Sequence, residues 1–181
     1  PQVIQEHFAG LRPILCANLP YNITTPILTK CVESRCFDSL TVLIQKEVAE
    51  RICARAGTAE YGAFTVLMQY YTDPQLLFTV PPTCFLPAPK VTSAVIQLKV
   101  RQNRDWGLAD ESIFFRTVRA SFAMRRKKLQ NGLASGFPQL GKAGAAQVIA
   151  AAGFDPNVRG ETLSIPEFVR LANEIVKWRE T

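Results

Sequence analysis

The residues Asn18-Leu19-Pro20-Tyr21 combine two hydrogen-bond acceptors with an aromatic ring, a set that suits a flat ring bearing an amino group. They follow the apolar run Ile14-Leu15-Cys16-Ala17, which predicts a buried strand. Proline fixes its own φ and biases the preceding residue toward extended geometry, so this strand should stop at a rigid turn. Such a turn leaves the Asn18 side-chain oxygen and the Leu19 carbonyl free to accept hydrogen bonds at the carboxyl end of a strand, where open α/β sheets bind ligands. The plainer alternative is that Asn18 caps a turn and Tyr21 packs in the core.

A second aromatic residue, Phe85, lies in a loop that four prolines make stiff, with the sequence PPTCFLPAPKV over residues 81–91. An aromatic side chain held in this way can form one side of a sandwich around an extruded base, with Tyr21 on the other side. Acceptors that hold both N–H bonds of an adenine amino group would favour a pyramidal nitrogen, whose lone pair can then attack an electrophile. The alternative is that Phe85 fills the core and the prolines only end a strand.

Three segments in this order are similar to one known family: Asn18-Leu19-Pro20-Tyr21, Phe85-Leu86-Pro87-Ala88-Pro89-Lys90-Val91-Thr92-Ser93, and Arg125-Arg126-Lys127-Lys128-Leu129-Gln130-Asn131. The chain resembles the ribosomal RNA adenine N6,N6-dimethyltransferases over essentially its whole length. Within them it is most similar to the small-subunit enzymes linked to kasugamycin sensitivity. DNA adenine methylases differ because they carry proline where this chain has Leu19.

The resemblance implies roles for the catalytic candidates Asn18, Leu19, Pro20, Tyr21 and Phe85. Asn18 and the Leu19 carbonyl, in the turn made by Pro20, would hold the adenine amino group. Asn18 would also lie beside the methionine part of the cofactor S-adenosyl-L-methionine. Tyr21 and Phe85 would stack on the flipped base, and the methyl group would be transferred directly, with no side-chain nucleophile.

The family's proteins begin with a strand and a glycine-rich turn that holds the cofactor, and this sequence contains no G-x-G-x-G. We therefore expect the chain to be a fragment or a partial record of a longer protein. By itself it should bind S-adenosyl-L-methionine poorly and should not methylate. Without the family's earlier strands, residues 14–17 would form an exposed sheet edge, from which we expect self-association.

Apolar periodicity predicts an α/β part over residues 1–103 and an all-helical part over residues 104–181, divided at the polar run 102–105. The resemblance implies that the first is the C-terminal portion of a Rossmann-like methyltransferase domain and that the second is a small rRNA-binding domain. We expect strands at 14–17, 41–45, 75–80 and 93–100, and helices at 24–33, 46–54 and 62–71 in the first part. The two strands that flank the proline loop should pair antiparallel at the edge of an otherwise parallel sheet.

Capping residues and apolar spacing predict the helices of the second part. Asp110 should cap a helix on which Phe114, Val118 and Phe122 recur every four residues, and Thr24 or Thr25 should cap the first helix of the α/β part. Further helices should begin at Arg125, at Lys142 and at a Ser164–Glu167 capping box.

The charge of the chain is uneven, because residues 101–181 hold 13 of the 21 basic residues and 8 of the 15 acidic residues. A basic surface favours a polyanionic partner, which for this family would be small-subunit rRNA or the pre-30S particle. The alternative for the run at 125–128 is a solvated helix start. Likewise, Lys46 and Glu47 follow a strand and could face the site, but a solvated helix start is the simpler interpretation. The candidate RNA-binding residues are Lys90, Arg116, Arg119, Arg125, Arg126, Lys127 and Lys128.

The five cysteines include no C-x-x-C pair, and His7 is the only histidine, which argues against a zinc site and a disulfide framework. A reducing, cytoplasmic setting follows. No apolar run is long enough to cross a bilayer. Two other functions stay open: dimethylation of large-subunit (23S) rRNA conferring macrolide resistance, and a non-catalytic ribosome-assembly factor that binds RNA.

Overall fold

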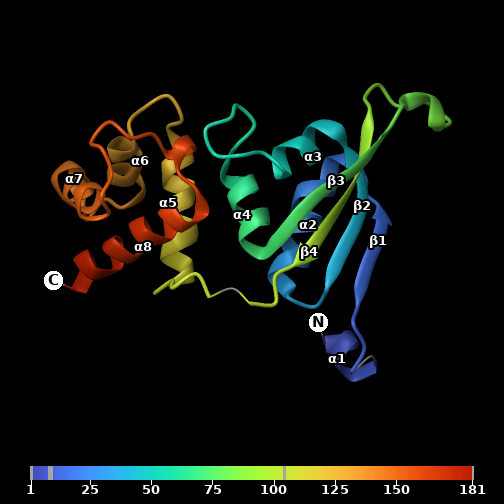
Figure 1. Ribbon diagram of the computed structural model, residues 1–181, viewed down its shortest axis with the longest axis horizontal. Coiled ribbons are helices and arrows are strands. Elements are labelled where there is room, and N and C mark those ends of the chain that lie inside the picture. The colour runs from blue at the N-terminus through green and yellow to red at the C-terminus, as the bar shows by residue number, and fades with distance from the viewer. Residues whose placement is uncertain (1, 8–9, 104, 181) are drawn as a thin grey trace. The chain divides into compact units, whose positions relative to one another are not determined.

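A computed structural model describes residues 2–7, 10–103 and 105–180, and Figure 1 shows its ribbon. The chain forms two compact units, one made of residues 1–54 and 67–104 and the other of residues 55–66 and 105–181. The second unit therefore includes residues 55–66, which the predicted division at 103/104 had assigned to the first part. Arg104, in the predicted boundary run, lies outside the described residues.

The first unit contains a four-stranded sheet in the order β1-β2-β4-β3. The parallel pair is β1 (Ile14–Asn18) and β2 (Ser39–Gln45), while β4 (Ser93–Val100) runs antiparallel to both β2 and β3 (Thr72–Val80). The antiparallel pair predicted on either side of the proline loop is thus confirmed, and Figure 1 shows the loop projecting beyond the ends of β3 and β4.

Alternate residues of the two central strands form the core of this sheet. Leu40 and Val42 of β2 face Leu98 and Ile96 of β4 in the antiparallel register, and all four are buried. The helices of this unit also bury apolar residues, among them Met68, which lies in the core as its apolar surroundings in the sequence predict. The helices are α1 (Gln2–His7), α2 (Thr24–Ser34), α3 (Lys46–Ile52) and the greater part of α4 (Ala63–Tyr71).

β1 differs from the predicted buried strand, because its residues alternate between exposed and half-buried. Ile14 is 68% exposed, since β1 stands at one end of the sheet and pairs only with β2 among the described residues (Figure 1). An apolar sequence pattern alone does not distinguish an end strand from a central one. The open edge is the one expected for residues 14–17 without further strands.

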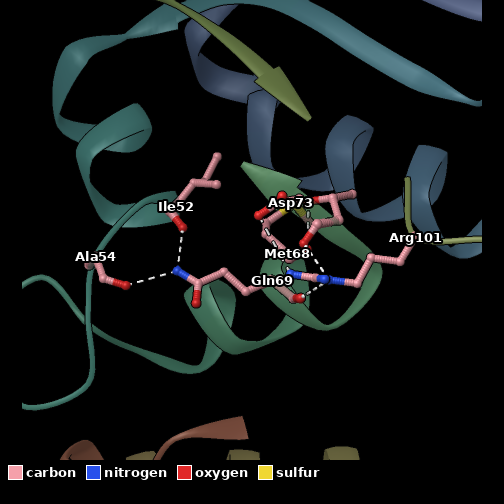
Figure 2. Close-up of polar contacts among 7 residues, drawn as sticks. Ile52, Ala54, Met68, Gln69, Asp73 and Arg101 are labelled. Carbon is pink, nitrogen blue, oxygen red and sulfur yellow. Dashed lines mark hydrogen bonds and ion pairs between the residues drawn. The ribbon is translucent and has the colours of Figure 1, made fainter. Parts of the chain in front are cut away.

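A polar network lies beside the points where the chain passes between the two units (Figure 2). The Gln69 side-chain amide donates to the carbonyls of Ile52 and Ala54 at 2.9 and 2.8 Å. The Arg101 guanidinium in turn donates to the carbonyls of Gln69 and Thr72 at 3.3 and 3.2 Å. The boundaries between the units fall after residues 54, 66 and 104. These hydrogen bonds therefore connect residues of the first unit that lie close to each boundary.

Four helices make up most of the second unit: α5 (Glu111–Ala123), α6 (Leu129–Gly136), α7 (Gly141–Ala151) and α8 (Ile165–Glu180). As predicted, Asp110 caps α5, because its carboxylate accepts from the backbone N–H groups of Ser112 and Ile113 at 2.8 and 3.0 Å. Phe114 and Val118 of α5 are buried, which confirms the face expected from their spacing, and Phe122 at its end is half-buried.

Tyr61 explains why residues 55–66 belong to the second unit. Its side chain is 2% exposed, its hydroxyl donates to the Leu163 carbonyl at 2.8 Å, and its ring packs edge-on against Phe122. Burial, together with the nearby Glu167 carboxylate, raises the pKa of Tyr61 to about 12, so the hydroxyl stays a neutral donor. These contacts link residues far apart in the sequence, and no local pattern encodes them.

The prediction that a helix begins at Arg125 is wrong, because residues 125–128 form a turn and α6 begins at Leu129. Four adjacent cations oppose the positive end of the helix dipole, which disfavours them in a first turn. The Ser164–Glu167 pair also differs from a reciprocal capping box. Glu167 accepts from both the backbone N–H and the hydroxyl of Ser164, at 2.8 and 2.7 Å, so the carboxylate is the acceptor in both bonds.

Candidate functional site

The turn after β1 is fixed through its backbone. The Leu19 N–H donates to the Leu43 carbonyl of β2 at 3.1 Å, and the Pro20 carbonyl accepts from the Ile23 N–H at 3.2 Å and from the Thr24 hydroxyl at 3.0 Å. Thr24 therefore does not cap α2 as predicted. Ile23 is the N-cap residue and makes no side-chain cap, while the buried Thr24 hydroxyl is turned back as a donor to the turn.

A cavity of about 300 Å³ lies at this turn. It is lined by the five residues singled out as catalytic candidates and by two prolines of the loop after β3, namely Asn18, Leu19, Pro20, Tyr21, Phe85, Pro87 and Pro89. The turn and the proline loop are more than 60 residues apart in the sequence, yet the sheet brings them to one place. A cavity of this size is at the small end of ligand pockets and suits a single planar ring system.

Two hydrogen-bond acceptors of the cavity are available to a ligand. The Asn18 side chain is exposed, and among the described residues neither its amide oxygen nor the Leu19 carbonyl accepts a hydrogen bond. Because the backbone bonds of Leu19 and Pro20 already hold the turn, the fold does not need these two acceptors. They can bind a group that offers two N–H bonds, which is what an exocyclic amino group provides.

The two aromatic residues of the cavity are held differently. Tyr21 is half-buried, and its hydroxyl oxygen lies 2.6 Å from the hydroxyl oxygen of Ser93. Phe85 is also half-buried and is held by its backbone, because its N–H donates to the Pro82 carbonyl at 3.1 Å. Neither ring is a fully buried core residue, so the plainer interpretations of both aromatic residues are less favoured. Their neighbour Leu86 is fully exposed.

The charged side chains that follow β2, those of Lys46 and Glu47, do not line the cavity. Lys46 pairs with Glu50 at 3.4 Å and Glu47 pairs with Arg51 at 2.8 Å, each one turn further along α3. This arrangement is the solvated helix start that the sequence favoured for the two residues. Lys90, in the proline loop, is exposed.

The cations predicted to bind RNA in the second unit fall into two groups. The Arg116 guanidinium donates to the Gly136 carbonyl at 2.9 Å and lies 4.4 Å from the centre of the Phe137 ring, and Arg125 donates to the carbonyls of Thr58 and Ala59. These two arginines hold the fold of their own unit. Arg125 is nevertheless exposed, and so are the four other cations, which have no such bonds among the described residues: Arg119, Arg126, Lys127 and Lys128.

Sequence reasoning did not place Ser93, Thr24, Pro87 or Pro89 among the site residues, although the first two bond to the turn residues and the two prolines line the cavity. The signal for Ser93 was present, because it ends the proline-loop segment and opens a strand of alternating pattern. Within the described ranges, no group of three or more histidine, cysteine or acidic side chains could hold a metal ion. No helix in the described part of the chain is long and apolar enough to cross a membrane.

Two solved structures share this fold. A dimethyladenosine transferase from Plasmodium falciparum superposes with a TM-score of 0.80 at 22% identity, covering 94% of this chain and 70% of that one. The 23S rRNA methyltransferase ErmE superposes with a TM-score of 0.61 at 21% identity, covering 93% and 69%. The chain accordingly has the mixed α/β, Rossmann-like fold of the rRNA methyltransferases.

Sequence comparison narrows this class to a family. The sequence model described as ribosomal RNA adenine dimethylase matches residues 4–177, so the chain belongs to the ribosomal RNA adenine dimethylase family. Proteins named ribosomal RNA small subunit methyltransferase A are similar to it: the one from Alkaliphilus oremlandii is 44% identical over 177 residues, and the one from Geobacillus kaustophilus is 45% identical over 177 residues. The alignments cover 97% and 96% of this chain. They span 62% and 60% of those two relatives.

Proposed function

We propose that the protein transfers two methyl groups from S-adenosyl-L-methionine to the N6 amino group of adenines in small-subunit (16S) rRNA during ribosome biogenesis. The observation that carries this proposal is the cavity in which Asn18, Leu19, Tyr21 and Phe85 meet, with two acceptors left available. The family and the names of the relatives support the choice of substrate.

In this proposal the target adenine leaves its helix and enters the cavity between Tyr21 and Phe85. The two N6 hydrogens are donated to the Asn18 side-chain oxygen and to the Leu19 carbonyl, which holds the nitrogen in a pyramidal geometry and directs its lone pair. Base stacking on the two rings offsets part of the cost of unstacking the base. Because Leu19 and Pro20 are fixed by backbone bonds, the acceptors are in place before the base arrives.

Asn18 also fits the role of a cofactor contact, because its exposed side chain stands at the carboxyl end of β1 without a partner among the described residues. When bound, S-adenosyl-L-methionine supplies a methyl group on a positively charged sulfur, which the adenine nitrogen attacks. The sequence contains no G-x-G-x-G. We therefore propose that these 181 residues by themselves bind the cofactor weakly and do not methylate.

We propose that the exposed cations bind the phosphates of small-subunit rRNA, free or in the pre-30S particle. This binding would take place in the cytoplasm. Arg119, Arg126, Lys127 and Lys128 of the second unit and Lys90 of the proline loop are exposed and can approach a polyanion. Such contacts position an RNA without reading its sequence, so the choice of adenine is left to the cavity. Arg116 and Arg125 contribute indirectly, by holding the fold.

The open edge of β1 supports a further part of the proposal. Ile14 is largely exposed on a strand whose outer side has no described partner, which is the usual setting for edge-to-edge pairing. We propose that the 181-residue chain self-associates through this edge. Analytical ultracentrifugation over a range of concentrations should show oligomers, and a single monomeric species throughout would contradict the proposal.

Asn18→Ala in the natural full-length protein tests the proposed function. Primer extension reads the product directly, because a dimethylated adenine stops reverse transcriptase. We expect methylation of 16S rRNA to fall about 100-fold or more, as with the loss of a preorganised polar contact in other enzymes, while rRNA binding is retained. Asn22→Ala is the matched control, because Asn22 is exposed, lies in the next turn and does not line the cavity. It should methylate at the wild-type rate.

The same experiment separates the two other functions. Stops on 23S rRNA in place of 16S rRNA would identify a large-subunit methyltransferase. Binding of rRNA without stops on either RNA, and without any effect of Asn18→Ala, would identify a non-catalytic assembly factor.

A further inference from the structure

Ser93 occupies a rigid position at the start of β4. It is fully buried, and it pairs by register with Gln45 of β2 on one side and with Val80 of β3 on the other. The carbonyl of the preceding residue, Thr92, accepts from the Lys46 N–H at 3.0 Å. A side chain mounted here has little freedom to move, because strands on both sides fix its backbone.

The Ser93 hydroxyl is connected to the cavity by its hydrogen bond to Tyr21, which lines the cavity. The two hydroxyl oxygens lie 2.6 Å apart, although the residues are 72 positions apart in the sequence. The backbone next to Tyr21 is fixed by the two bonds to the Pro20 carbonyl, so the tyrosine is held at its base by the turn and at its far end by Ser93. With both ends of its long axis held, the ring keeps its place at the wall of the cavity.

We propose that Ser93 is a positioning residue for the methyl transfer: it holds the Tyr21 hydroxyl so that the ring stays in its place at the wall of the cavity before the adenine enters. This inference rests on the proposed function. A ring that is already oriented does not have to be ordered when the base binds, so the base reaches the reactive geometry more often. Phosphate contacts elsewhere on the RNA supply most of its affinity, so the loss should fall on kcat more than on KM.

Two variants remove this hydrogen bond from opposite ends. Ser93→Ala keeps the strand and deletes one hydroxyl, while Tyr21→Phe keeps the aromatic ring and deletes the other. In the natural full-length protein, with 16S rRNA in small ribosomal subunits as substrate, each should lower kcat about tenfold and leave KM nearly unchanged. The double variant should be no slower than either single variant, because both remove the same interaction.

Ser121→Ala is the matched control. Ser121 is also a buried serine, and its hydroxyl donates to the Thr117 carbonyl at 2.7 Å, within the helical unit. Its loss should lower thermal stability and leave kcat unchanged, which separates the removal of a buried serine hydroxyl as such from the loss of ring positioning.

The outcomes are distinct. A wild-type kcat in Ser93→Ala, or losses that multiply in the double variant, would overturn the role of Ser93 while leaving the proposed function in place. A wild-type protein that methylates neither 16S nor 23S rRNA would overturn the proposed function, and the inference with it. Should Ser93→Ala fail to fold, Tyr21→Phe alone decides, since a wild-type kcat in that variant contradicts the inference.

Discussion

The turn at residues 18–21 and the cationic segment at residues 125–128 use their polar groups in opposite ways. In the turn, backbone groups of Leu19 and Pro20 make the bonds that hold the structure, and the acceptors that face the cavity are left available. In the cationic segment, the side chain of Arg125 makes the bonds that hold the structure, by donating to two carbonyls of the loop before α4. Arg125 is exposed like the three cations after it, but among the described residues only Arg125 is held by side-chain hydrogen bonds.

The comparison shows that similar residues in a run are not equivalent. Four consecutive cations look alike in a sequence, but one of them is committed to the fold. In the turn, by contrast, backbone groups of Leu19 and Pro20 make the bonds that fix the structure. Neighbouring side chains therefore remain available for binding. Substitutions in the two regions should therefore separate function from stability in different ways.

After Asn18→Ala, the largest expected effect concerns the aromatic side of the cavity. Phe85→Ala should lower kcat/KM for rRNA methylation by about tenfold to a hundredfold, because stacking on an aromatic ring is worth about 1–3 kcal/mol per base. Leu86→Ala is the adjacent control, since Leu86 is 101% exposed and does not line the cavity. Primer-extension kinetics on 16S rRNA measures both variants. Equal rates for the two would show that Phe85 does not contribute to binding the base.

The next effect concerns the exposed cations. Replacing Arg126, Lys127 and Lys128 together by glutamine should weaken rRNA binding and make the plot of log affinity against log salt less steep by about 2–3, since each phosphate contact contributes about 0.7–0.9. Filter binding at several salt concentrations measures the slope. Arg125→Gln should leave that slope unchanged, and a change of about 0.7–0.9, the contribution of one phosphate contact, would contradict the division drawn here.

Arg125 should instead affect stability. Arg125→Ala should lower the free energy of unfolding by about 1 kcal/mol, because two backbone carbonyls lose their donor. Arg126→Ala, one residue further on and exposed, should stay within about 0.5 kcal/mol of wild type. Urea denaturation followed by circular dichroism compares them, and equal midpoints would show that the Arg125 contacts contribute nothing to folding.

The smallest effect depends on pH. Hydrogen bonds from the Ser164 hydroxyl and N–H, with the cation of Arg170 nearby, lower the pKa of Glu167 against the opposing effect of burial. A lowered pKa in the folded state adds stability above the unfolded-state pKa, and this stability is lost as the pH falls through the folded-state value. Glu167→Gln should therefore be less stable than wild type at pH 7, and the difference should shrink below the ordinary glutamate range. Melting temperatures measured from pH 7 to pH 3 test this, and a constant difference would contradict it.

Local patterns in the sequence predicted those parts of the fold that depend on neighbouring residues. The alternation of Ala94, Ile96 and Leu98 gave the buried face of β4, and Asp110 gave the start of α5. The two segments of the cavity could be identified because proline limits the backbone around Asn18 and around Phe85. Their meeting in one cavity depends on the register of the sheet, which the sequence pattern does not specify.

Most of the predictions that failed concern long-range contacts. The apolar character of β1 does not reveal that it ends the sheet, and nothing near Tyr61 in the sequence indicates its bond to Leu163. The Thr24 hydroxyl was expected as an acceptor at a helix start and is a donor to the turn instead. Arg125 was expected in a helix, but its partners lie more than 60 residues earlier in the chain. Except for Thr24, whose partner Pro20 is only four residues away, each case depends on a partner distant in sequence.

The amide of Gln69 has a consequence for the ageing of the protein. Both of its hydrogen bonds, to the carbonyls of Ile52 and Ala54, depend on one nitrogen. Slow hydrolytic deamidation would exchange that nitrogen for an oxygen, and an ionised carboxylate has no hydrogen to donate. Two attractions would then become two repulsions, so the damaged molecule would loosen where α3 ends, while the residues that line the cavity stayed chemically intact.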